Sequence, residues 1–116
     1  MDLRKAYYLS SCDTCKRILK ELDWKDDQQD IKQENVSAAV LDDWYKTTQS
    51  YEALFNKRAR KFKAIKETVK TDKDFRKLIL EEYTFLKRPV LVIDDQIFVG
   101  NSKAVVSAAA ECYSLK

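Results

Sequence analysis

The sequence contains no histidine, one glycine (Gly100) and one proline (Pro89). Without histidine, the Ser-His-Asp and Cys-His forms of nucleophilic catalysis are excluded, and so is every His-ligated metal site. A single glycine cannot supply the glycine-rich loops that bind dinucleotides or nucleotide phosphates. Any chemistry must therefore use cysteine, carboxylate, lysine, arginine or tyrosine.

Long apolar runs and a large excess of one charge are also missing. No stretch approaches the roughly 18 apolar residues of a membrane span, and Met1 to Lys5 carry no signal-peptide pattern. The chain has 116 residues, 45% hydrophobic and 35% charged, and 22 basic against 19 acidic residues give a net charge of +3. We expect one soluble domain over residues 1–116, located in the cytoplasm, that neither enters a membrane nor binds nucleic acid directly.

The periodicity of apolar residues predicts an α/β domain with a mixed sheet. A βαβ unit at the start and a ββα unit at the end enclose a helical middle, which gives the order β-α-β, helices, β-β-α. In the middle, Ser37, Ser50 and the Thr71/Asp74 capping pair each predict a helix start. The last of these helices would carry its apolar stripe from Phe75 to Leu86. The predicted strands are 5–9, 28–31, 90–93 and 97–99, the first helix starts near Thr14, and the last helix starts at 100–102.

The segment Cys12-Asp13-Thr14-Cys15 lies between the first predicted strand and the first helix. A helix N-terminus carries unpaired N–H groups and a partial positive charge, and Lys16 adds a cation nearby, so a thiolate is favoured there. Cys15 falls on the apolar stripe of the helix and Cys12 does not. We therefore expect Cys12 to be the exposed, attacking thiol and Cys15 the more buried, resolving thiol.

Two other interpretations of these cysteines stay open. The CxxC pair could be half of a zinc site, although only Cys112 remains as a further sulfur ligand. Both cysteines could also be inert and buried, as free cysteines commonly are. Cys112 itself lies on the apolar stripe of the last helix and is assigned to the core.

Three segments together resemble the ArsC/Spx family, the arsenate reductase-like branch of the thioredoxin-fold proteins. They are Tyr7 to Lys16 with the CxxC pair, Ala53-Leu54-Phe55-Asn56-Lys57-Arg58, and Leu86-Lys87-Arg88-Pro89-Val90 followed by Phe98-Val99-Gly100. The resemblance implies a thioredoxin-like four-stranded mixed sheet with a helical insertion over about 37–85.

The same resemblance implies the site residues. Cys12 would be the nucleophile, Arg58 and Arg88 would face the cysteine loop and bind an oxyanion, and Pro89 would be the cis-proline beside the substrate. Taken singly, each arginine could be an ordinary surface charge. The family suggests that Cys12 attacks a small oxyanion or thiol substrate and that Cys15 or glutathione resolves the adduct. No cofactor would be bound, and glutathione, a glutaredoxin or a thioredoxin would supply the electrons.

The sequence also departs from the classical arsenate reductases of this family. Those carry one cysteine in the loop, and they have an arginine after the last hairpin where this chain has Gly100. The CxxC pair is instead the arrangement of Spx-like regulators, which bind the α subunit of RNA polymerase and use the disulfide as a switch. We expect an arsenate reductase-like oxidoreductase, with an Spx-like regulator as the alternative.

A basic segment in the middle of the chain offers a third interpretation, nucleic-acid binding. An ordinary solvated face explains its mixed pattern better. The residues concerned are Lys57, Arg58, Arg60, Lys61, Lys63 and Lys66, with Phe62 among them.

Overall fold

The computed structural model describes residues 4–114 and divides the chain into two compact units. The first joins the chain up to Glu34 to the chain from Arg88 onwards, and the second is Asn35–Lys87. The predicted insertion over 37–85 falls within the second unit, and a single domain over 1–116 stays a prediction. None of the helices within residues 4–114 combines the length and the apolar character needed to cross a membrane.

The first unit contains the sheet. Its strands are β1 (Arg4–Tyr8), β2 (Asp27–Asp30), β3 (Val90–Ile93) and β4 (Gln96–Val99), in the order β2-β1-β3-β4. β1 and β2 are parallel, whereas β1 with β3 and β3 with β4 are antiparallel. The predicted fold class, a four-stranded mixed sheet in an α/β domain, is therefore confirmed.

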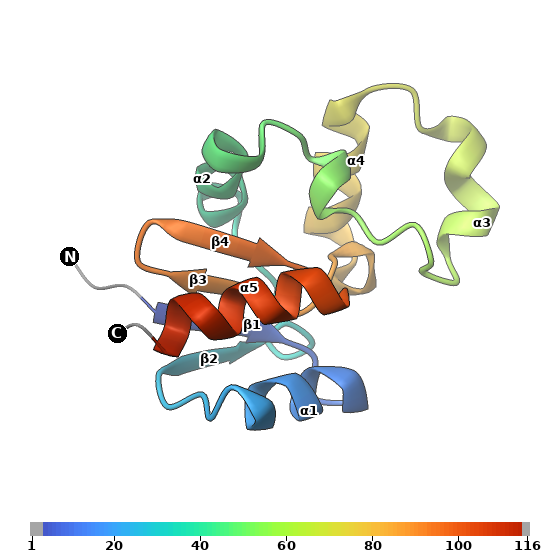
Figure 1. Cartoon of the computed structure of the whole chain (residues 1–116). Helices are drawn as coiled ribbons and strands as arrows, with labels where there is room; N and C mark the ends of the chain where they lie inside the picture. The colour runs from blue at the N-terminus through green and yellow to red at the C-terminus, as the bar shows by residue number, and fades with distance from the viewer. Residues whose placement is uncertain (1–3, 115–116) are drawn as a thin grey trace. The chain divides into compact units, whose positions relative to one another are not determined.

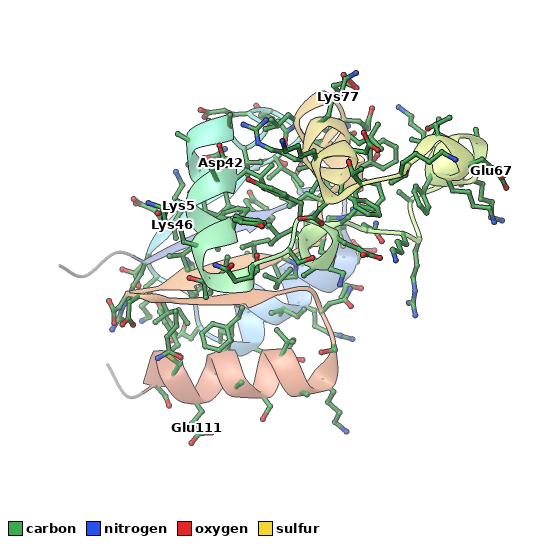
Figure 2. The ribbon with its side chains drawn as sticks, turned by 90° about the horizontal axis from the view of Figure 1, so that it is seen from above. Lys5, Asp42, Lys46, Glu67, Lys77 and Glu111 are labelled. Atoms are coloured by element: carbon green, nitrogen blue, oxygen red, sulfur yellow. The ribbon has the colours of Figure 1, made fainter. Side chains whose placement is uncertain are left out.

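Two helices cover one face of this sheet: α1 (Asp13–Glu21) and α5 (Lys103–Ser114) (Figure 1). Side chains alternate along a strand, so every second residue of β1 and β3 points to this face. Glu111 on the far side of α5 points away from the sheet (Figure 2). Cys112 is half-buried and packs against this core, as its stripe position predicts. The core consists of Ala6, Ile18, Leu19, Leu22, Trp24, Leu91, Ile93 and Ala109.

Polar and aromatic contacts join the end of α5 to β1 and to the loop before β2. The ring of Tyr113 stacks on Trp24 with centroids 4.5 Å apart, and the Arg4 guanidinium lies 5.3 Å from the Tyr113 centroid. The Tyr113 hydroxyl donates to Asp26 Oδ2 at 2.6 Å and accepts the backbone N–H of Lys25 at 3.0 Å. Both the aromatic stacking and the polar contacts thus hold the last helical turn in place.

The second unit is helical. It contains the α-helices α2 (Ala38–Thr48), α3 (Phe62–Ile65) and α4 (Asp72–Glu81), and the 3-10 helices η1 (Glu52–Leu54), η2 (Lys66–Thr68) and η3 (Tyr83–Phe85). The side chains of Lys77 on α4 and Glu67 in η2 extend outwards from their elements (Figure 2). The α2 cap is the predicted one, since Ser37 Oγ accepts the Val40 N–H at 3.2 Å. α4 begins with the predicted Thr71/Asp74 capping box.

The prediction that one helix continues to Leu86 is wrong. α4 ends at Glu81, because Glu82 adopts an extended conformation with φ −144° and ψ 114°. The Glu82 carboxylate then accepts the N–H and the hydroxyl of Thr84, at 3.3 and 2.9 Å, which stabilises η3. The spacing of apolar residues therefore continues past the end of α4, but Tyr83 lies in the 3-10 helix η3 and not in α4.

Phe55 lies at the centre of the second unit and is 1% exposed. Its ring contacts those of Phe62, Phe75 and Phe85, with centroid distances of 5.0, 4.9 and 5.0 Å. The backbone of Phe55 also pairs with that of Leu86 in an isolated antiparallel β-bridge, which joins the chain segments around these two residues. Aromatic contacts thus connect η1, α3, α4 and η3.

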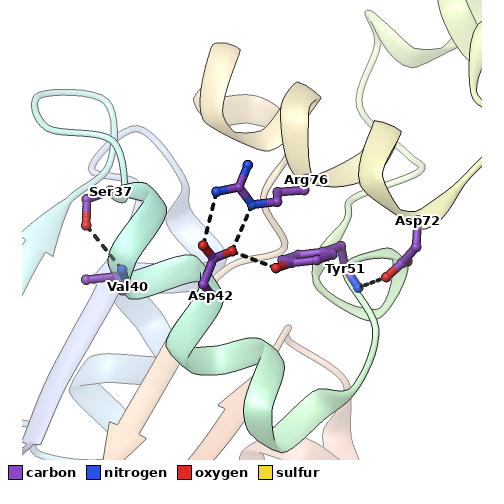
Figure 3. Close-up of polar contacts among 6 residues, drawn as sticks. All are labelled: Ser37, Val40, Asp42, Tyr51, Asp72 and Arg76. Atoms are coloured by element: carbon purple, nitrogen blue, oxygen red, sulfur yellow. Dashed lines mark hydrogen bonds and ion pairs between the residues drawn. The ribbon is translucent and has the colours of Figure 1, made fainter.

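A charged network connects α2, η1 and α4 at the surface of the same unit (Figure 3). The Arg76 guanidinium donates to both oxygens of Asp42, at 2.8 and 3.0 Å, and the Tyr51 hydroxyl donates to Asp42 Oδ1 at 2.6 Å. Asp72 accepts the backbone N–H of Tyr51 at 2.9 Å. Contacts with Arg76 and Tyr51 lower the pKa of Asp42 to about 2, so this carboxylate is ionised at neutral pH.

Candidate active site

The loop between β1 and α1 places Cys12 at the first turn of α1. The Cys12 N–H donates to the Leu9 carbonyl at 2.9 Å, which forms a tight turn, and the Cys12 carbonyl accepts the Lys16 N–H at 3.2 Å. Cys12 is the N-cap residue of the helix, with φ −98° and ψ 109°. The thiol therefore lies where the N–H groups of the first turn have no partner within the helix.

Cys12 and Cys15 lie in contrasting environments. Cys15 is fully buried and Cys12 is half-buried, and the two do not form a disulfide. Burial, with a contribution from the neighbouring Cys12 sulfur, raises the pKa of the Cys15 thiol to about 12, against the lowering effects of the Leu9 backbone and of Arg88. At neutral pH, Cys15 is therefore a protonated thiol.

The pKa of Cys12 is lowered. Burial alone would raise it, but the backbone N–H and thiol of Cys15 and the charge and hydrogen bonding of the Arg88 guanidinium together outweigh the effect of burial. An anion that accepts hydrogen bonds and faces a cation is the usual source of a reactive cysteine. Of the two thiols, Cys12 therefore loses its proton more easily than Cys15.

The sheet topology explains why Arg88 reaches this loop. β3 runs antiparallel to β1, and Val90 at its start pairs with Tyr7 near the end of β1. The residues just before β3 therefore lie at the edge of the sheet from which the cysteine loop departs. Arg88 is half-buried at this edge, and Pro89 follows it, buried, after a cis peptide bond as the resemblance implies.

Gly100 follows the last residue of β4 and lies beside Pro89, at the edge of the sheet from which the cysteine loop departs. Its N–H donates to the Pro89 carbonyl at 2.9 Å, and its φ of 92° is in the region that favours glycine. Gly100, which stands where the classical arsenate reductases have a third arginine, thus contacts Pro89 through its backbone. No cation comes from this position.

Arg58 belongs to the second unit, so it is described separately. It lies in the turn after η1, its side chain is exposed, and its backbone N–H donates to the Asn56 side chain at 3.1 Å. Asn56 in turn donates its backbone N–H to the Phe85 carbonyl at 2.7 Å. The structure therefore brings Cys12, Cys15, Arg88 and Pro89 together within the first unit, and it describes Arg58 as an exposed residue on a fixed turn.

The basic segment around Arg58 is solvated, as predicted, but it does not form one continuous helix. It consists of a turn, the short α3 and η2, and its cations are exposed. Lys57 pairs with Glu52, and Lys61 pairs with Glu82 at 2.8 Å. Phe62 points inwards to Phe55, so it is not available to stack on a base.

Asp30, which sequence analysis did not single out, also contacts the cysteine loop. Its Oδ1 accepts the Ser10 N–H at 3.2 Å and the Lys32 N–H at 3.1 Å. The one available signal was its place at the end of β2, which is parallel to β1 and therefore ends at the same edge of the sheet. Within residues 4–114, no three His, Cys, Asp or Glu side chains gather as they would around a metal ion.

Comparison with known proteins agrees with this geometry. The structure is similar to the arsenate reductase from Vibrio cholerae, with a TM-score of 0.78, 14% identity, and coverage of 94% of this chain and 96% of that one. It is also similar to an arsenate reductase (ArsC) related protein from Brucella melitensis, with a TM-score of 0.67, 28% identity, and coverage of 90% and 92%. No curated protein matches the sequence. The family model of the ArsC family matches residues 7–109, which is most of the chain, and the chain therefore belongs to the ArsC family.

Proposed function

We propose that this protein is a thiol-dependent oxidoreductase in which Cys12 is the nucleophile. The observation that carries the proposal is the contrast between the two cysteines: a half-buried Cys12 with a lowered pKa beside Arg88, and a buried Cys15 that keeps its proton. Membership of the ArsC family supports this kind of chemistry. A small oxyanion such as arsenate is the substrate class that fits a thiolate next to a guanidinium.

In the first step the Cys12 thiolate attacks the central atom of the oxyanion. A bond forms between sulfur and arsenic, an As–O bond breaks, and the oxygen leaves as water after taking up protons. Arg88 neutralises charge on the remaining oxygens. Arg58 and Pro89 complete the proposed substrate site on the strength of the family resemblance, with Arg58 as a second oxyanion-binding cation.

In the second step a thiol attacks the Cys12 sulfur. The S–As bond breaks, its electron pair stays on arsenic, which is reduced from As(V) to As(III), and a disulfide forms with loss of one thiol proton. Cys15 is the thiol within reach. Once Cys12 is bonded to arsenic it is no longer an anion, so one cause of the high pKa of Cys15 disappears and the Cys15 proton is lost more easily.

External thiols complete the cycle. Glutathione, a glutaredoxin or a thioredoxin would reduce the Cys12–Cys15 disulfide, and glutathione could also replace Cys15 as the attacking thiol. This scheme needs no bound cofactor. It also needs a reducing compartment, so we place the protein in the cytoplasm.

The experiment that tests the proposal is oxidation by arsenate without any other thiol. The reduced protein is incubated with arsenate, and the products are identified by mass spectrometry of peptides and by assay of arsenite. We expect one Cys12–Cys15 disulfide per arsenite formed. Cys12→Ser should abolish both products, whereas Cys15→Ser should give arsenite only when glutathione is added.

Cys112→Ser is the matched control, because Cys112 packs against the core formed by α5 and is not in the cysteine loop. It should behave like the wild type. If arsenate, selenate and a low-molecular-weight disulfide all leave Cys12 reduced, the proposed oxidoreductase function is wrong.

A redox-sensing regulator is the second candidate, and the Cys12/Cys15 pair is the feature that favours it. In this alternative, the disulfide would change the affinity for a partner such as the RNA polymerase α subunit and would not turn over substrate. Binding of purified α subunit to the oxidised and reduced forms separates the two candidates. Equal absence of binding in both forms would remove the regulator.

A further inference from the structure

We infer that Asp30 is a positioning residue for Cys12: its carboxylate fixes the start of the cysteine loop, so that the Cys12 sulfur meets the N–H group and the cation that stabilise its thiolate. This inference rests on the proposed function, because it concerns the same reactive thiol. It assigns Asp30 no contact with substrate. Its basis is the geometry of the parallel β1–β2 pair and the loop that follows.

The strand register places Asp30 beside the loop. Tyr8, the last residue of β1, pairs with Asp30, the last residue of β2. The Ile31 N–H continues the ladder by donating to the Tyr8 carbonyl at 2.9 Å. Beyond this point β1 turns into the cysteine loop and has no further strand partner on this side.

Asp30 supplies the next contact after the ladder ends. Its Oδ1 accepts the Ser10 N–H at 3.2 Å and also the Lys32 N–H at 3.1 Å. The hydroxyl and the N–H of Ser10 lower the pKa of Asp30, and the Lys32 contacts add to this. Asp30 is therefore an ionised acceptor at neutral pH, and one oxygen joins two loops.

The anchored residue is close to the thiol along the chain. Ser10 is two residues before Cys12, and the intervening turn is closed by the Cys12 N–H donating to the Leu9 carbonyl at 2.9 Å. If Ser10 is released, this turn loses the contact that ties it to the end of β2. The Cys12 side chain would then sample positions away from the Cys15 N–H and from Arg88, which lower its pKa.

A purely electrostatic role of Asp30 predicts the opposite effect. A carboxylate near a thiol disfavours the thiolate, so its removal should lower the pKa of Cys12. Loss of the anchor should instead raise the pKa of Cys12, because burial then acts without the full set of compensating contacts. The direction of the change therefore distinguishes positioning from charge.

The test compares the pH dependence of Cys12 alkylation in four variants, read by mass spectrometry of the labelled peptide. Asp30→Ala loses both acceptor and charge, and we expect its midpoint to rise by at least about half a unit toward the unperturbed value of about 8.5. Asp30→Glu keeps the charge but misplaces the acceptor, and its midpoint should rise as well. Asp30→Asn keeps an oxygen acceptor and should stay close to the wild type or slightly below it.

Asp27→Ala is the matched control, because it removes the same charge from the first residue of β2, three positions before Asp30 on the same strand. Its midpoint should equal that of the wild type. Amide hydrogen exchange provides the second readout: exchange at Ser10 and Cys12 should accelerate in Asp30→Ala and not in Asp30→Asn. Asp30 and Ser10 line an open polar hollow of about 510 Å³, so the substitution leaves no sealed cavity.

The outcomes separate the two proposals. An ordinary midpoint in the wild type would overturn the proposed function and this inference with it. A lowered midpoint in the wild type that is unchanged or falls further in Asp30→Ala would overturn the inference alone. Should Asp30→Ala not fold, the same decision follows from Asp30→Glu, whose side chain keeps the native charge.

Discussion

Replacement of Arg88 by methionine should raise the pKa of Cys12. The substitution removes the guanidinium charge and keeps an unbranched side chain of similar volume at the residue before Pro89. In the native protein, burial acts against the Cys12 thiolate, and the contacts with Cys15 and Arg88 act for it. Without Arg88, only the N–H and thiol of Cys15 remain to offset burial.

The expected size follows from the position of the thiol. An opposite charge at close range lowers the pKa of an acid by about 1–3 units. Cys12 is half-buried, so water screens part of this effect and the lower end of the range applies. We expect a rise of about 1 unit, equivalent to about 1.4 kcal/mol. At neutral pH the thiolate fraction would fall by up to about tenfold, and alkylation would slow in proportion.

The assay is a pH titration of thiolate absorbance in the ultraviolet, in a Cys112→Ser background that leaves two thiols. Cys15, with a pKa of about 12, titrates far above Cys12 and does not interfere. Arg17→Met is the matched control: Arg17 lies on α1, its side chain is 66% exposed, and it pairs with Glu21. A midpoint that moves equally in the two variants, or in neither, would refute the assignment of Arg88 to the thiolate.

Three further substitutions test the packing. Phe55→Ala should lower the free energy of unfolding by about 3–5 kcal/mol in urea denaturation, since it opens a cavity among three aromatic rings; a loss below about 1 kcal/mol would contradict its central position. Tyr113→Phe should lower the free energy of unfolding by about 1 kcal/mol, because it removes the hydroxyl that contacts Asp26 and the Lys25 N–H and retains the ring stacking. An unchanged melting temperature would show that the C-terminal end of α5 is already frayed. Thr71→Ala should cost about 1 kcal/mol through loss of the α4 cap, whereas Thr71→Ser should restore most of it.

Much of the first unit could be predicted from the sequence because its signals are local. The aromatic run before Cys12, the apolar run 90–93 and the Asp94-Asp95 turn predict strands and a hairpin within one or two residues of those observed. The burial contrast between Cys12 and Cys15 also follows from helical periodicity alone. These features depend on residues that are neighbours in the chain.

The contributions of Arg88 and Asp30 could not be predicted from the residues alone. Arg88 reaches Cys12 only because β3 is antiparallel to β1, and Asp30 reaches Ser10 only because β2 is parallel to it. Strand order and direction are set by packing of the whole sheet, which a single sequence encodes weakly. The break at Glu82 was missed for a similar reason: the apolar spacing continues through it, and the side-chain contacts with Thr84 that favour the break are visible only in three dimensions.

Activation of Cys12 is tested by competitive alkylation of the reduced wild-type protein over a range of pH, with each modified cysteine identified by mass spectrometry. We expect Cys12 to be labelled first, with a midpoint below about 8.5, while Cys15 stays unmodified until the protein is unfolded. A midpoint at or above that value, or equal labelling of the two cysteines, would show that Cys12 is not an activated nucleophile supported by a protonated Cys15.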